Sequence, residues 1–173
     1  MFGVQAFKPE GPIGGAGFVF TRHPEIPEML CASDDGDVYT FDWTQRATED
    51  TPKIEFVTKI WNAERSYRPI VGIELSPFFD DIILSFHDYY FCLWRMDTDV
   101  QIFYSPILEH ASISCGCFSP VRPGVIFVGR TDGHLDIWDL TDQSHTYIMH
   151  HFVISAGIAS MKFQANSHLL VID

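Results

Sequence analysis

Two pairs of adjacent carboxylates are the first residues in this sequence whose types could support chemistry. Asp34-Asp35 and Asp80-Asp81 could supply a general acid and a general base. Both pairs lie in segments that read as turns, where aspartate is common because its side chain binds nearby backbone groups. The sequence also lacks a nucleophile elbow, a phosphate loop and a zinc-protease helix motif. We therefore interpret both pairs as turn residues and expect no enzyme activity.

The histidines and cysteines do not suggest a metal site. His150 and His151 are adjacent, so on a strand they would point to opposite faces and could not bind one ion together. The cysteines lie in or beside apolar segments without C-x-x-C spacing: Cys31, Cys92, Cys115 and Cys117. We interpret them as buried thiols, with a disulfide as the less favoured alternative. We expect no catalytic residue, metal or cofactor.

Composition indicates one folded domain that avoids polyanions. The chain has 173 residues, of which 46% are hydrophobic, enough for a substantial core. Its 11 basic and 23 acidic residues give a net charge of −12, which repels phosphate backbones and anionic lipid. No apolar run approaches the roughly 20 residues of a membrane helix, and the first residues do not resemble a secretory signal. Nucleic acid and membrane are therefore not expected partners.

The stretch 122–140 contains the clearest structural signal. An apolar run, Val125 to Val128, is followed by an Asp132-Gly133 turn and then by apolar residues alternating with polar ones. This pattern predicts a hairpin whose second strand has one buried face.

The same layout occurs three times, and in each unit an aromatic residue lies six positions after an aspartate. The pairs are Asp35 with Phe41, Asp88 with Trp94, and Asp132 with Trp138. The aromatics are 53 and 44 residues apart, close to the roughly 40–45 residues of a four-stranded propeller blade. A polar insertion at 44–53 accounts for the longer interval.

The predicted fold is therefore an all-β propeller with about three and a half four-stranded blades and almost no helix. We expect an N-terminal extension at 1–12, blades at 13–61, 70–105 and 113–150, and the first half of a further blade at 157–173. Propellers close with 4 to 8 blades, so the expected ring is incomplete. The chain is then a piece of a longer protein, or another component completes its ring.

These residues resemble two nested families. Ser119-Pro120, Asp132-Gly133 and Trp138-Asp139 resemble the WD-repeat family. Within it, the segments at 76–84 and 122–125 resemble the dynein intermediate chains, closest to that of the axonemal two-headed inner arm. The sequence departs from the family where Phe41 replaces Trp, Tyr89 replaces Gly and Arg95 replaces Asp. The light-chain-binding segment of the family has no counterpart here.

The resemblance implies a non-catalytic scaffold. It implies binding to the dynein heavy chain and to other dynein intermediate and light chains, in the cytoplasm and in the axoneme of cilia or flagella. The alternative is a WD-repeat adaptor of another assembly, such as a ubiquitin-ligase receptor or a trafficking coat. A propeller enzyme is the least favoured interpretation.

The resemblance also implies a buried network in the third blade, in which His110, Asp132 and Trp138 bond to one another. The other residues expected to have structural roles in their blades are Phe41, Trp94, Asp35 and Asp88.

Candidate partner-binding residues lie in the link after the first blade and in the turns. They are Trp61, Arg65, Tyr67, Arg68, His87, Tyr89 and Arg130. Arginine and aromatic residues are enriched at the energetic centres of interfaces. The alternative, equally weighted, is that Trp61 and Tyr67 only pack on the outer strand. Phe78 and Phe79 are either core plugs, the preferred interpretation, or exposed anchors.

Overall fold

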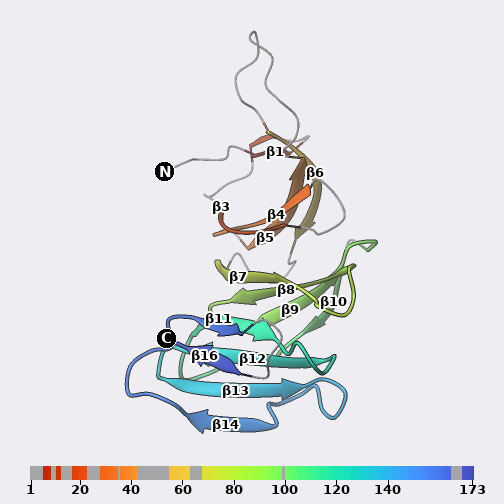
Figure 1. Cartoon of the computed structure of the whole chain (residues 1–173). Helices are drawn as coiled ribbons and strands as arrows, with labels where there is room; N and C mark the ends of the chain where they lie inside the picture. Colours follow the sequence, from red (N-terminus) through yellow and green to blue (C-terminus); the bar gives the residue numbers. More distant parts are fainter. Residues whose placement is uncertain are drawn as a thin grey trace.

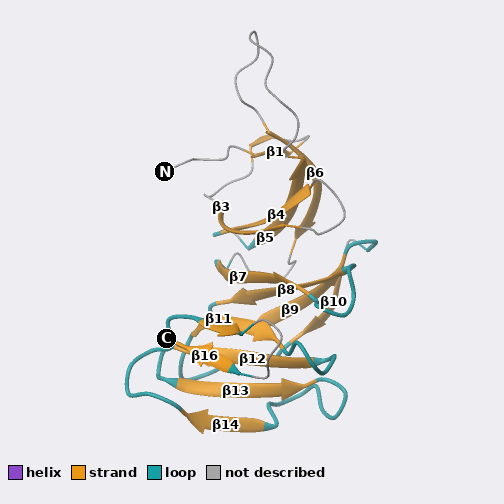
Figure 2. Cartoon of the chain, viewed as in Figure 1, coloured by secondary structure: helices purple, strands orange, loops and turns teal. Residues whose placement is uncertain are grey.

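The computed structural model describes residues 6–8, 11–12, 17–22, 28–34, 36–42, 55–62, 68–98, 100–164 and 169–173; in the first sheet, side chains are described only at 29–34, 36–40 and 61. The described residues form β-strands and no helix (Figure 2). The strands form successive sheets that follow one another along the chain (Figure 1). The predicted all-β, unclosed partial propeller is confirmed. None of the described segments forms a helix able to cross a bilayer.

The first sheet has six strands rather than the expected four. Its antiparallel strands are β3 (Gly17–Arg22), β4 (Glu28–Ser33), β5 (Asp37–Asp42) and β6 (Glu55–Asn62). Two short strands, β1 (Ala6–Lys8) and β2 (Gly11–Pro12), extend it beyond β6, and β1 runs parallel to β6. The expected N-terminal extension at 1–12 thus contains two strands at the outer edge of this sheet.

The second and third sheets have four antiparallel strands each. The second contains β7 (Ile70–Leu75), β8 (Ile82–His87), β9 (Phe91–Arg95) and β10 (Gln101–Tyr104). The third contains β11 (Ile113–Phe118), β12 (Val125–Arg130), β13 (His134–Asp139) and β14 (Met149–Phe152). A final pair, β15 (Met161–Phe163) and β16 (Leu170–Ile172), follows. The hairpin predicted within 122–140 is confirmed as β12 and β13. The expectation that its second strand has one buried face is wrong, because β13 has buried residues on both faces.

Two kinds of turn recur at equivalent places. Between the first and second strands of the second sheet, the Ser76 hydroxyl accepts hydrogen bonds from the two backbone N–H groups of Phe78 and Phe79. Ser119 does the same in the third sheet. Between the second and third strands, Gly36 and Gly133 have φ of 88° and 81°, a conformation that favours glycine.

The hydrophobic core lies between sheets, because the central strands are buried on both faces. On β8, Ile83 joins a cluster shared with the first sheet and Leu84 joins one shared with the third. Phe86 reaches across to β11, where a Cβ added to Gly116 would lie 2.2 Å from two atoms of its ring. Glycine at this position is therefore what allows the second and third sheets to pack closely.

The chain leaving the third sheet is held against the turn at Gly133. The Gly133 carbonyl accepts hydrogen bonds from the N–H groups of Val153 and Ile154. A Cβ on Gly133 would lie 1.7 Å from the Ile154 carbonyl oxygen. Farther along, the Ile158 N–H donates to the Arg130 carbonyl at 3.1 Å. One turn thus fixes both its own hairpin and the path toward β15.

Candidate functional site

A buried hydrogen-bonded chain in the second sheet fixes the position of Trp94. Its indole Nε1–H donates to Ser85 Oγ at 2.8 Å, and Ser85 Oγ lies 3.3 Å from His87 Nε2. His87 Nδ1 lies 3.2 Å from the Arg68 carbonyl oxygen, which can only accept, so Nδ1 carries the hydrogen and Nε2 accepts from Ser85. Burial lowers the pKa of His87 to about 4, against smaller opposing effects of Arg68 and Asp88, which keeps this tautomer neutral at pH 7.

The equivalent network predicted for the third sheet is wrong. His110 is exposed, and the Trp138 Nε1 has no hydrogen-bond partner among the described residues. The physical reason is one substitution: Val128 holds on β12 the place that Ser85 holds on β8, so Trp138 has no acceptor. Asp132 instead contacts Arg130 and His134. Trp138 therefore stabilises its sheet only by packing.

The first sheet completes the comparison. Cys31 on β4 corresponds to Ser85, and Phe41 on β5 corresponds to Trp94 in the pairing of strands. Because a phenyl ring has no N–H to donate, the fold does not need a hydroxyl acceptor at position 31. The side chain of Phe41, and Asp35 as a whole, lie outside the described residues.

Arg130 is a buried ion-pair residue and not an exposed contact, so its prediction as a partner-binding residue is wrong. Its guanidinium lies 3.2 Å from Asp136, which is fully buried, and 3.2 Å from Asp132. Asp136 is also bonded to His150, whose ring stacks on His134 at 4.4 Å. Although burial acts against it, contacts with His134 and Arg130 hold the pKa of Asp132 below its usual value. The two carboxylates compensate the charge of Arg130, so its guanidinium can be buried among the strands.

Among the described residues, no three His, Cys, Asp or Glu side chains lie in an arrangement that could hold a metal ion.

Two further predicted contacts, Trp61 and His87, are also buried, which contradicts their assignment to a partner surface. Trp61 packs in the cluster between the first two sheets, and its Nε1–H donates to the Thr98 carbonyl at 2.8 Å. Trp61 is therefore a packing residue, but it packs in the core between two sheets and not on the outer strand. Arg65 and Tyr67 lie outside the described residues.

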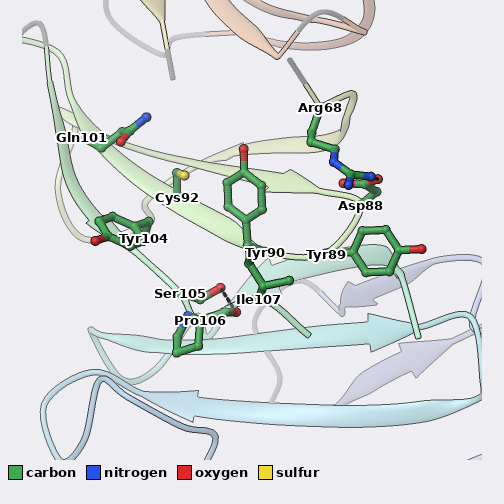
Figure 3. A pocket seen from close by; sticks show the side chains of 10 residues that line it. All are labelled: Arg68, Asp88, Tyr89, Tyr90, Cys92, Gln101, Tyr104, Ser105, Pro106 and Ile107. Atoms are coloured by element: carbon green, nitrogen blue, oxygen red, sulfur yellow. Dashed lines mark hydrogen bonds and ion pairs between the residues drawn. The ribbon is translucent and has the colours of Figure 1, made fainter. Parts of the chain in front are cut away.

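The remaining two candidates, Arg68 and Tyr89, lie together at a pocket of about 200 Å³ (Figure 3). The Arg68 guanidinium donates to Asp88 at 2.9 Å and lies 5.4 Å from the Tyr89 ring centroid. The ion pair is half exposed, so solvent screens it and it contributes little to stability. The other walls come from β9, β10 and the segment after β10: Cys92, Gln101, Tyr104 and Ile107. This pocket is the best-supported interaction site among the predicted residues.

A second hollow, of about 270 Å³, is lined by residues from the first strand of each of three successive sheets. Glu74 comes from β7, Phe118 from β11, and Lys162 from β15. The Glu74 carboxylate accepts the Phe118 N–H at 2.6 Å and so links the second and third sheets. Burial raises the Glu74 pKa to about 7, against the lowering effects of this bond and of Lys162. Sequence reasoning missed Glu74 because nothing in its local pattern shows what faces it across the sheets.

The residues first considered for chemistry have ordinary surroundings. Asp34 is an exposed turn residue, and Asp81 accepts a hydrogen bond from Arg95 Nε at 2.9 Å. The four cysteines form no disulfide, and burial raises the pKa of Cys92 and Cys117 to about 12. Thiols with such pKa values are poor nucleophiles.

Phe78 and Phe79 are 39% and 54% exposed, so the preferred interpretation of them as core plugs is wrong. The Ser76 turn holds their backbone at the surface.

Comparison with known proteins gives a consistent result. The family model of the "Dynein axonemal intermediate chain 3 WD40 domain" matches residues 25–173. A dynein axonemal intermediate chain 3 from Macaca fascicularis is 31% identical over 123 residues, which are 68% of this chain and 13% of that protein. The flagellar outer-arm 70 kDa dynein intermediate chain of Chlamydomonas reinhardtii is 27% identical over 135 residues, 76% of this chain and 22% of that protein. This chain thus spans only a small part of these relatives.

Proposed function

The chain belongs to the dynein axonemal intermediate chain 3 WD40 domain family, and we propose that it is a non-catalytic part of an intermediate-chain scaffold in an axonemal dynein. The observation that carries this proposal is the family match over residues 25–173. The site geometry agrees with it, because the strongest polar contacts are structural and the accessible features are a pocket and exposed apolar side chains. Such a surface suits protein binding.

We propose further that the scaffold belongs to an inner arm. It binds the dynein heavy chain together with other intermediate and light chains, in the cytoplasm and in the axoneme. Support for the inner arm comes from the sequence resemblance at 76–84 and 122–125. One relative is named as an outer-arm chain, so the arm needs a direct test.

The test is to tag the protein in a ciliated cell and isolate axonemes from cells with and without outer arms. We expect the tagged protein to remain in axonemes that lack outer arms and to crosslink to a dynein heavy chain. Loss of the tagged protein together with the outer arms would contradict the inner-arm assignment. Recovery with ubiquitin-ligase or coat subunits, and with no dynein subunit, would overturn the scaffold proposal itself.

A further inference from the structure

The outermost strand of the second sheet, β10, presents apolar side chains to solvent. Val100, just before the strand, is 63% exposed, and Ile102 and Tyr104 are 49% and 51% exposed. Gln101 and Phe103, which lie between them, are less exposed. The pairing with β9 is irregular between Gln101 and Phe103, so Ile102 lies at a bulge of the strand and the regular ladder resumes at Phe103. Among the described strands, β10 pairs with β9 alone. An outer strand of this kind is a template for an added strand.

The first sheet shows that an outer edge of this fold accepts such a strand. There β6 has the place that β10 has in the second sheet, outermost of four antiparallel strands. β1 pairs with β6 in parallel, with Ala6 opposite Glu55 and Phe7 opposite Phe56. A fifth strand is thus present at one outer edge, while none of the described segments covers the next.

The pocket of about 200 Å³ lies beside this strand, and Gln101 and Tyr104 of β10 form part of its wall (Figure 3). Its volume suits one large apolar side chain. Within it, Arg68 and Asp88 neutralise each other. The pocket therefore selects for size and apolar character and not for charge.

The flanks of the strand are acidic. Arg95 is shared by Asp81 and Asp97, which leaves one negative charge before β10, and Glu109 is exposed beyond its other end. The whole chain has a net charge of −12. Basic residues at the ends of a bound segment would complement these charges.

We propose that β10 and its pocket bind an extended segment of a protein partner, which adds as a fifth strand to the second sheet. The segment has apolar residues at alternate positions, one large apolar residue that enters the pocket, and lysine or arginine at its ends. Backbone hydrogen bonds supply affinity and the pocket supplies specificity. This inference goes beyond the dynein assignment and does not depend on it.

The experiment selects random 12-residue peptides displayed on phage against the purified full chain and measures the affinity of the enriched peptides as synthetic probes. We expect the predicted alternation and basic ends, and binding at least 10-fold weaker to Ile102→Lys. Met149→Lys is the matched control, because Met149 is 53% exposed on β14, the outermost strand of the third sheet. It should bind the peptides as the unaltered chain does.

A second measurement changes only the peptide, so it does not depend on how the variants fold. Backbone N-methylation at alternate residues should abolish binding in one register and spare it in the other, because every second amide faces the sheet edge. Equal binding to Ile102→Lys, indifference to N-methylation in both registers, or failure to enrich alternating peptides would each overturn the proposal.

Discussion

Replacing Trp94 and Trp138 in turn by phenylalanine tests the difference between the second and third sheets. Both side chains are buried, so Trp→Phe removes a similar part of the ring from each site. In Trp94→Phe the chain also loses the hydrogen bond to Ser85, a net contribution of about 1 kcal/mol. In Trp138→Phe it loses a buried N–H that has no partner among the described residues, which relieves a cost of about 1–3 kcal/mol. The free energy of unfolding should therefore fall by about 2–4 kcal/mol more in Trp94→Phe than in Trp138→Phe.

The assay is urea unfolding followed by far-ultraviolet circular dichroism, since both substitutions remove a fluorophore, with equal m-values required for the comparison. Ser85→Ala combined with Trp94→Phe should show a coupling energy of about 1 kcal/mol. Val128→Thr should lower the free energy of unfolding by less than a buried hydroxyl without a partner normally does, because the new hydroxyl can accept a hydrogen bond from the Trp138 indole N–H. Equal losses in the two phenylalanine variants, or a larger loss in Trp138→Phe, would refute the assignment of donor and acceptor.

The remaining predictions concern pH and packing. The Glu74 pKa is about 7 in the folded chain and 4.5 in the unfolded chain. Glu74 therefore stabilises the fold fully below pH 4.5, by about 3 kcal/mol at most, and this contribution is lost as the pH rises through 7. Because the His87 pKa is about 4 against 6.5, its contribution is lost as pH falls from 6.5 to 4. The two slopes oppose each other, so urea unfolding at several pH values should show a steeper rise with pH in Glu74→Gln; an unchanged slope would contradict this. Gly116→Ala should cost about 2–3 kcal/mol by overpacking against Phe86. Gly72→Ala, whose Cβ would lie 3.3 Å from the same ring, should cost less than 1 kcal/mol, and similar thermal unfolding of the two variants would argue against the close packing.

Strand positions could be predicted because their signals are local. Alternating apolar residues and turn residues such as Asp132-Gly133 and Ser119-Pro120 determine backbone conformation within a few residues. The added strands β1 and β2 were missed because segments of three and two residues are too short for a period to show.

Side-chain roles were harder to predict because they depend on strand register and on the neighbouring sheet. His87 and Arg130 are buried because both faces of their central strands are covered. Trp61 lies on the outer strand β6 but is buried in the cluster between the first two sheets. A signal for the Trp94 network was available: the residues at the same strand position are cysteine, serine and valine in the three sheets, and only serine has an oxygen acceptor for an indole N–H. Its meaning required the cross-strand pairing.

The contacts of Gly133 have a consequence for hydrogen exchange. Val153 and Ile154 lie in an exposed segment without strand structure, so by surface position alone their amides should exchange within the fast-opening part of the molecule. Both amides nevertheless donate to the Gly133 carbonyl, and the Ile158 amide donates to Arg130. Their protection should therefore follow the opening of the β12–β13 hairpin, so a coil segment reports the local stability of a neighbouring turn.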